Sequence, residues 1–512
     1  MAGTTGVSRR RCGILLHPTS LPGRFGIGDL GPAAAAFADF LAAAGQRLWQ
    51  VLPLVPTGYG DSPYQGLGAL AGNPLLLSPE ALAAEGLAEP GELSSAPAFP
   101  EGAVDFGAVI AWKGALLRRV AERFDARAGP GRRRAFEDWR GARSAWLGDY
   151  ALFAALKERH GGLPWTRWEP ALAARRPRRL ARARRELAEE IRAQELGQFL
   201  FAEQWASLRR LCQERGIELV GDLPIYLALD SADVWARPDL FHLDERGAPT
   251  AVAGVPPDYF SAAGQLWGNP LYRWEERGPE CRALFVERAA AALELVDVVR
   301  LDHFRGLEAY WAVPVAAGDA TRGEWRPGPG AALLEELAVE LGALPFIAEN
   351  LGVITPEVEA LRHRFGLPGM AVLQFAFGKD PQAPGFLPHN YQRDLVAYTG
   401  THDNDTVLGW WRSEGGDSTR TADDVRREKE HARRYLATDG REMNWVMIRA
   451  LLASVAAAAV VPLQDALGLG SEGRMNRPST AGGNWRWRFR QGDLGPALAA
   501  RLGELAALYG RA

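Results

Sequence analysis

The sequence has few of the residues that build disulfide frameworks or metal sites. Its 512 residues include only three cysteines, Cys12, Cys212 and Cys281, and eight histidines. Three scattered cysteines are too few for a disulfide scaffold, and no cysteine or histidine pair has the spacing of zinc ligands. No cluster of oxygen ligands indicates calcium either. We therefore expect no metal and no cofactor.

An excess of charge of one sign and long apolar runs are also missing. The net charge is −3, which gives no electrostatic reason to expect nucleic acid or an acidic membrane as a partner. No run approaches the roughly 20 apolar residues of a membrane span, and "GILL" at 13–16 is too short for the core of a signal peptide. We predict a soluble cytoplasmic protein without an obligate protein partner.

Short apolar runs that end in polar residues recur along the chain. Continuous runs bounded by Gly or Pro are typical of buried parallel strands, and helical patterns such as "PAAAAFADFLAAAG" alternate with them. Eight strands alternating with helices predict an α/β fold, a (β/α)₈ TIM barrel, in which catalytic groups gather at the carboxyl ends of the strands. The eight runs are 13–20, 48–54, 217–226, 298–304, 344–352, 370–377, 395–405 and 458–465.

Two stretches between these runs are longer than a crossover helix requires. Residues 55–215 are rich in Ala, Arg, Glu and Leu and predict a mainly helical insertion. Its basic segment "RRPRRLARARR" fits a solvated helix face better than a nucleic-acid site. A second insertion, 227–296, contains a Pro- and aromatic-rich segment. Little chain follows the last run, so we expect a single catalytic barrel over 1–512 with no C-terminal β-sandwich.

Three of the runs end in an acidic residue: Asp302, Glu349 and Asp403. Cleavage of a glycosidic bond with retention needs a carboxylate and a carboxylic acid about 5–5.5 Å apart. Neighbouring parallel strands, about 4.8 Å apart, can hold two carboxyls at that separation. By strand alternation Arg300 points to the same face as Asp302, where its charge would keep that aspartate ionised. Apolar neighbours are expected to raise the pKa of Glu349 toward that of a usable acid.

Each of these residues also has an ordinary structural interpretation. A single acid at a strand end often caps a helix or pairs with arginine, and "THDND" at 401–405 can be a turn with Asx hydrogen bonds. His303 and His402 can be packed histidines or metal ligands, although no spacing supports a metal. Three acids in order on three predicted strands favour catalysis over these alternatives.

The joined motifs resemble one family. "RLDHFRG", "AENLG" and "GTHDNDT", with "HPTSLPG" and "LPLVPTGYGDSPYQ" near the start, are similar to the 4-α-glucanotransferases of glycoside hydrolase family 77, and the likeness extends from about residue 12 to "GNWRWR" at 483–488. The resemblance implies transfer of α-1,4-glucan segments from a maltodextrin donor to the 4-hydroxyl of glucose or another glucan. It also implies a retaining double displacement through a covalent glycosyl-enzyme.

The resemblance further implies a role for each matching residue. Asp302 would be the nucleophile, Glu349 the acid and base, and Asp403 would hold the 2- and 3-hydroxyls of the reacting glucose. Tyr59 would be a secondary glucan contact, and the loop that carries Tyr259 would overhang the cleft. The full set of implied substrate-binding residues is Ser62, Tyr64, Asp222, Tyr259, Phe260, Gln265, Trp267, Arg300, His303, Phe375, His402 and Asn476.

Three alternatives remain open at this stage. Core packing explains Trp267 and Phe375 as well as a substrate contact does. With water as acceptor, the same acids would make the chain an α-glucan hydrolase of the amylase type, and sequence pattern alone does not decide between water and a sugar. A catalytically silent glucan-binding barrel would keep the fold, but binding alone does not require all three acids.

Overall fold

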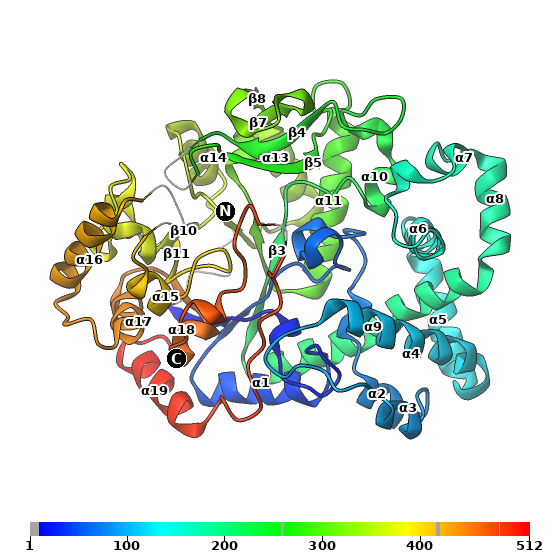
Figure 1. Ribbon diagram of the computed structural model, residues 1–512, viewed down its shortest axis with the longest axis horizontal. Coiled ribbons are helices and arrows are strands. Elements are labelled where there is room, and N and C mark those ends of the chain that lie inside the picture. The colour runs from blue at the N-terminus through cyan, green and yellow to red at the C-terminus, as the bar shows by residue number, and fades with distance from the viewer. Residues whose placement is uncertain (1–9, 258–260, 416–419, 481) are drawn as a thin grey trace.

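Eight parallel strands form the centre of the molecule (Figure 1). The computed structural model describes residues 10–257, 261–415, 420–480 and 482–512. Neighbouring strands follow the order β10-β11-β12-β1-β2-β3-β6-β9. The amide of Ala348 donates to the carbonyl of Pro368 at 2.9 Å, so the two edge strands meet and the barrel nearly closes. The strands are β1 (Arg11–Leu15), β2 (Leu48–Gln50), β3 (Glu218–Leu223), β6 (Val298–Leu301), β9 (Phe346–Ala348), β10 (Gly369–Val372), β11 (Leu395–Tyr398) and β12 (Ala458–Pro462).

Each of the eight predicted runs overlaps one of these strands, and the predicted barrel is confirmed. Side chains alternate between the barrel interior and the surrounding helices because successive strand residues point to opposite faces. On β6, Val298 packs into the interior cluster while Val299 packs outward. The same alternation turns Arg300 inward, and its partner in register on β3 is Asp222. The barrel interior is therefore apolar at the amino ends of the strands and charged at their carboxyl ends.

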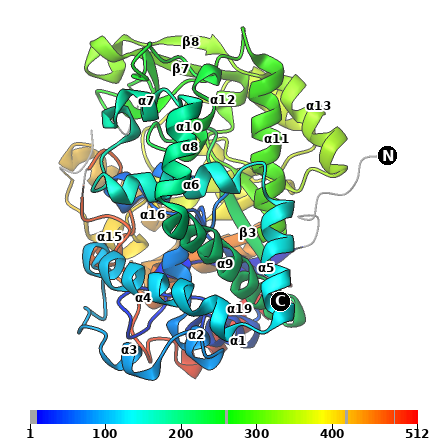
Figure 2. The ribbon, with the colours of Figure 1, turned by 90° about the vertical axis from the view of Figure 1, so that its right-hand side faces the viewer.

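Helices surround the barrel (Figures 1 and 2). Those outside the helical subdomain described next are α1 (Pro32–Ala43), α9 (Ala188–Glu214), α10 (Ala232–Ala236), α11 (Gly278–Leu295), α12 (Arg305–Glu308), α13 (Gly330–Leu341), α14 (Pro356–Arg364), α15 (Val407–Arg412), α16 (Ala422–Leu436), α17 (Met443–Ala453), α18 (Leu463–Leu467) and α19 (Pro496–Leu508). After β12, the described residues form helices and loops and no β-sandwich.

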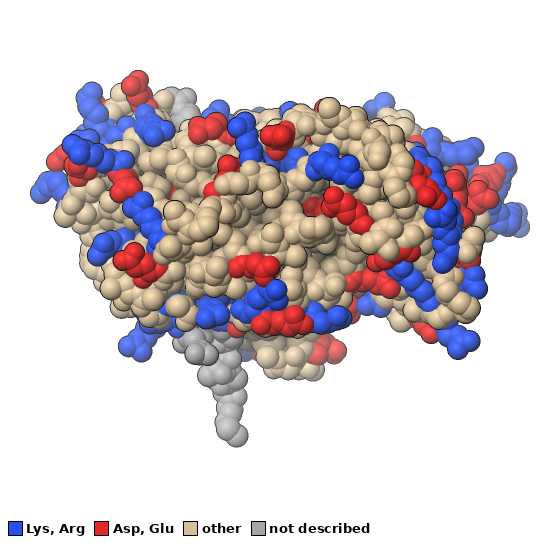
Figure 3. Space-filling view, turned by 90° about the horizontal axis from the view of Figure 1, so that it is seen from below, with Lys and Arg blue, Asp and Glu red and all other residues tan. Residues whose placement is uncertain are grey.

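A helical subdomain lies to one side of the barrel, at the right of Figure 1. Its helices are α2 (Pro79–Ala84), α3 (Pro90–Ser94), α4 (Phe106–Arg127), α5 (Pro130–Ala142), α6 (Leu147–Arg159), α7 (Pro170–Ala173) and α8 (Pro177–Glu186). The basic segment noted in the sequence forms α8, where Arg182 pairs with Glu186 at 2.6 Å and Arg184 with Asp149 at 2.8 Å. Acidic and basic side chains are likewise mixed over the face in Figure 3.

A second sheet, of four antiparallel strands, was not predicted. Its order is β5-β4-β7-β8, with β4 at Ala251–Val255, β5 at Gln265–Pro270, β7 at Ala309–Pro314 and β8 at Glu324–Pro327. Two of these strands precede β6 and two follow it, so the sheet joins segments that the sequence separates. It lies at the top of Figure 1 and carries Gln265 and Trp267 on β5.

Candidate active site

One arginine holds three carboxyl groups at the carboxyl ends of β3, β6 and β9. Arg300 Nη1 lies 2.6 Å from Asp222 Oδ2 and 3.0 Å from Asp302 Oδ1, and its Nη2 lies 3.9 Å from Glu349 Oε1. The arginine side chain is only 5 % exposed. One buried cation stabilises negative charge on its neighbours but does not neutralise three carboxylates, so the site favours a proton on one of them.

The Glu349 carboxyl holds a proton at neutral pH. Burial raises its pKa to about 8; Arg300 opposes this rise, and the negative charge of Asp302 adds to it. The amide of His303 donates to Glu349 Oε2 at 2.5 Å. A carboxylic acid that stays protonated near pH 7 can act as a general acid. The Asp302 carboxyl, by contrast, is 27 % exposed and lies against the arginine.

His303 adopts a left-handed backbone conformation, with φ of +51°. This conformation is uncommon for a residue with a Cβ and clusters at functional sites. Burial lowers the pKa of the imidazole to about 3, so the ring is neutral. Its Nε2 is buried and has no hydrogen-bond partner in the described part of the chain. The ring meets Trp267 edge to face, with centroids 4.8 Å apart, and its unpartnered nitrogen can bind a ligand hydroxyl.

A tyrosine from the loop after β2 contacts the same cluster. Tyr64 donates its hydroxyl to Asp222 Oδ2 at 2.7 Å. The Ser62 hydroxyl accepts from the amide of Tyr64 at 3.2 Å and caps the short 3₁₀ turn η3 (Pro63–Gln65). Burial raises the pKa of Asp222, although the contact with Arg300 opposes the rise. The second oxygen of this carboxyl, Oδ1, has no partner among the described residues, so it can accept from a bound molecule.

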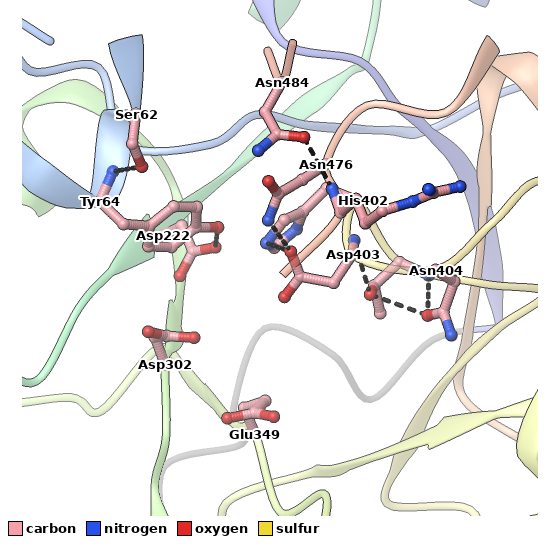
Figure 4. A network of polar contacts seen from close by, with 12 residues as sticks. Ser62, Tyr64, Asp222, Asp302, Glu349, His402, Asp403, Asn404, Asn476 and Asn484 are labelled. Atoms are coloured by element: carbon pink, nitrogen blue, oxygen red, sulfur yellow. Dashed lines mark hydrogen bonds and ion pairs between the residues drawn. The ribbon is translucent and has the colours of Figure 1, made fainter. Parts of the chain in front are cut away.

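Asp403 stands opposite this cluster, on the loop after β11 (Figure 4). Asn476 Nδ2 donates to Asp403 Oδ1 at 2.6 Å, and His402 Nε2 lies 3.4 Å from the same oxygen. The amide of Asn476 also donates to the carbonyl of His402 at 3.1 Å. The His402 ring stacks on Tyr64 at 5.1 Å. Because the Asp403 side chain is 46 % exposed, its carboxyl is held in place and still reaches the open space that Asp302 and Glu349 also face (Figure 4).

The remaining predicted contacts are placed less centrally. Trp267 Nε1 donates to Gln265 Oε1 at 3.2 Å, beside the His303 ring. Phe375, in the 3₁₀ turn η9 (Leu373–Phe377), packs against Phe386 and the apolar interior of the barrel. Tyr59 is 77 % exposed and makes none of the contacts of this network. The other two predicted contacts, Tyr259 and Phe260, lie outside the described residues.

Sequence reasoning missed three neighbours of the site. His17 is buried, which lowers its pKa to about 3, and the charge of His402 lowers it further. The Trp485 ring lies 5.7 Å from that of Tyr64, and Arg474 donates to the carbonyl of Asp403 at 2.9 Å. These residues lie in the motifs "HPTSLPG", "GNWRWR" and "RMNRP", so the sequence did indicate their neighbourhood. Sequence pattern alone does not show which residues of a motif contact the site.

The described part of the chain has neither a candidate metal site nor a helix that could cross a membrane. No group of three His, Cys, Asp or Glu side chains in this part of the chain could hold a metal ion. Among the helices of the same residues, none combines the length and the apolar character that a membrane crossing requires.

Comparison with known proteins gives one consistent result. A family model described as 4-alpha-glucanotransferase matches residues 16–493. The 4-alpha-glucanotransferase of Thermus thermophilus is 50% identical over 505 residues, 97% of this chain and 98% of that protein. That of the Synechocystis strain is 48% identical over 507 residues, 98% of both chains. The solved structure of amylomaltase from Streptococcus agalactiae in complex with acarbose is 36% identical, with a TM-score of 0.92 over 98% of this chain and 100% of that one.

Proposed function

The chain belongs to the 4-α-glucanotransferases of glycoside hydrolase family 77, and we propose that Asp302 and Glu349 carry out its glucan transfer by a retaining double displacement. The observation that supports this assignment best is the shared contact with Arg300, 3.0 Å from Asp302 and 3.9 Å from Glu349. Neighbouring strand ends thus present one carboxyl beside a cation and one protonated carboxyl toward the same space. Retaining cleavage of a glycosidic bond requires such a pair.

In the first step, an Asp302 oxygen attacks the anomeric carbon of the donor glucose. The bond from that carbon to the departing 4-oxygen breaks, and Glu349 gives its proton to this oxygen, so the shortened donor leaves with a free hydroxyl. The raised pKa of Glu349 supports this role, because the proton is present before the reaction starts. Arg300 stabilises the charge of Asp302 until it is used in the new bond.

In the second step, the 4-hydroxyl of the acceptor attacks the anomeric carbon and displaces Asp302. Glu349, now ionised, takes the hydroxyl proton, and the new α-1,4 bond forms. Esterified Asp302 no longer carries the negative charge that raised the pKa of Glu349 in the free enzyme. The pKa of Glu349 therefore falls at this stage. Its carboxylate stays ionised until an acceptor binds and can then act as the base.

The other polar groups suit the recognition of a glucose unit. Asp403 would hold its 2- and 3-hydroxyls, and the unpartnered Asp222 Oδ1 and His303 Nε2 would take further hydroxyls. Trp267 offers a ring for a sugar face. The remaining proposed contacts are Ser62, Tyr64, Tyr259, Phe260, Gln265, Phe375, His402 and Asn476, with Tyr59 as a separate surface contact. We propose α-1,4-glucans as donors and glucose or maltodextrins as acceptors, and the cytoplasmic location stays a prediction.

The nucleophile can be tested by trapping the intermediate. Glu349→Gln treated with α-maltosyl fluoride should accumulate a glycosyl-enzyme, because fluoride leaves without a proton and no base remains to activate the acceptor. Mass spectrometry of the digested protein should place the added sugar on Asp302. A label on another residue would contradict the assignment, and so would label in the doubly substituted control, Asp302→Asn with Glu349→Gln.

A further inference from the structure

Residues 303–305, directly after Asp302, hold the loop that carries Glu349 at three points. The amide of His303 donates to Glu349 Oε2 at 2.5 Å, and the amide of Phe304 donates to the Glu349 carbonyl at 3.1 Å. Farther along the loop, Arg305 Nη1 donates to the carbonyl of Val353 at 2.7 Å. The acid is therefore fixed at its carboxyl, at its backbone and at the far end of its loop.

The arginine in this set is itself held by the second sheet. Arg305 is 6% exposed, and its guanidinium carbon lies 3.8 Å from the centroid of the Trp325 ring on β8. That ring meets Trp311 of β7 edge to face at 5.1 Å. A guanidinium stacked on an indole loses rotational freedom, so Nη1 is held toward the Val353 carbonyl before substrate arrives.

The backbone at the start of the segment is fixed by its own packing. His303 has a φ of +51°, and a residue with a Cβ keeps this left-handed conformation only where the surroundings fix it. The residue after the arginine, Gly306, has no room for a Cβ, which would lie 2.8 Å from Cδ2 of the His303 ring. Thus the segment closes tightly around His303 and points its amide at the Glu349 carboxyl.

We propose that Arg305 is a positioning residue for Glu349. Arg305 fixes the loop 349–353, so that the Glu349 carboxyl stays hydrogen-bonded to the His303 amide and in line with the departing oxygen. This inference rests on the proposed role of Glu349 as acid and base. Arg305 acts without touching substrate. Removal of the Arg305 guanidinium should leave Asp302, Arg300 and the sugar contacts in place. It should loosen only the Glu349 carboxyl, which transfers the proton.

Two substrates with different leaving groups distinguish a loss of proton transfer from a general loss of activity. A 4-nitrophenolate leaves without protonation, whereas the 4-oxygen of a glucan needs the proton of Glu349. For both substrates, kcat/KM reports the steps up to release of the first product. A misplaced acid therefore lowers kcat/KM for maltotriose far more than for 4-nitrophenyl α-maltoside, while a merely structural defect lowers both alike.

The test variant is Arg305→Met, which keeps an apolar chain on the Trp325 ring and removes the donors. We expect kcat/KM for maltotriose to fall about 100-fold and kcat/KM for the aryl maltoside to fall less than about 5-fold. The loss should appear in kcat and leave KM for maltotriose within about 3-fold. Arg305→Lys, which can still donate to the Val353 carbonyl, should recover at least about 10-fold of the loss.

The matched control is Arg364→Met, because Arg364 also lies over an aromatic ring, that of Phe365 at 5.3 Å, but belongs to an exposed ion pair with Glu335. It should leave both substrates unchanged. If Arg305→Met does not fold, Trp325→Leu, which removes the ring under the guanidinium, should give the same selective loss on a smaller scale.

Equal losses on the two substrates, or no loss on maltotriose, would overturn the positioning role. A wild-type enzyme that does not transfer glucan at all would instead contradict the proposed function, so the two failures can be told apart.

Discussion

Raising the pH should remove the proton that Glu349 must give to the departing glucan. Burial raises the pKa of this carboxyl to about 8, so about nine-tenths of the molecules carry the proton at pH 7. A carboxyl with the ordinary glutamate pKa of 4.5 would be protonated in only about 0.3 % of the molecules at that pH. The raised pKa therefore increases the acid form by roughly two orders of magnitude, and burial is the largest cause of the rise.

The same numbers predict the shape of the pH profile. Since only the protonated form cleaves the donor, kcat/KM for maltotriose should fall above about pH 8 and reach about one-tenth of its plateau at pH 9. The carboxyls of Asp302 and Asp222 raise the pKa of Glu349 and Arg300 lowers it. The observed midpoint therefore belongs to this cluster of charges as a whole.

The assay is the initial rate of glucose release from maltotriose across this pH range, compared with release of 4-nitrophenol from the aryl maltoside. The control substrate is the aryl maltoside, because its 4-nitrophenolate leaves without a proton. The wild-type rate on this substrate should not show the fall above pH 8. A wild-type rate on maltotriose that stays flat to about pH 10, or the same fall with the aryl maltoside, would refute the assignment of the high-pH fall to Glu349.

Three further substitutions test other parts of the structure. Asp302→Asn should abolish transfer while circular dichroism shows an unchanged fold; substantial turnover in the pure variant would remove the nucleophile assignment. Tyr64→Phe removes the hydroxyl that donates to Asp222 at 2.7 Å and should lower kcat/KM about 10-fold; an unchanged value would mean that this bond does not organise the site. Arg511→Ala removes a buried guanidinium that donates to several carbonyls, including that of Leu452 at 2.7 Å, and should lower unfolding free energy by about 3 kcal/mol with KM unchanged; an unchanged denaturation midpoint would contradict this.

The barrel could be predicted because its information is local. Each strand is a continuous apolar run, and parallel strands in a barrel all present their carboxyl ends on one face. That rule alone brings Asp302, Glu349 and Asp403 to one side of the molecule. Alternation along β6 then places Arg300 on the face of Asp302, as the 3.0 Å contact between them bears out.

The features that the sequence did not predict depend on pairings between distant segments. The second sheet pairs Ala251 of β4 with Pro314 of β7, although β5, α11, the barrel strand β6 and α12 lie between them in the chain. No turn signal in the sequence marks such a pairing. The contact from Arg305 to Val353 could not be predicted either, because no local pattern around one residue indicates the other as its partner. His17 was missed for a different reason, because its burial beside His402 appears only once β1 and β11 are placed in one barrel.

The most direct test of the central claim is to incubate the purified protein with maltotriose and separate the products by chain length over time. Transfer through Asp302 and Glu349 predicts glucose together with a ladder of maltodextrins longer than three units, and neither product from Asp302→Asn. Glucose and maltose alone would make water the acceptor and contradict the account, and unchanged maltotriose would contradict catalysis itself.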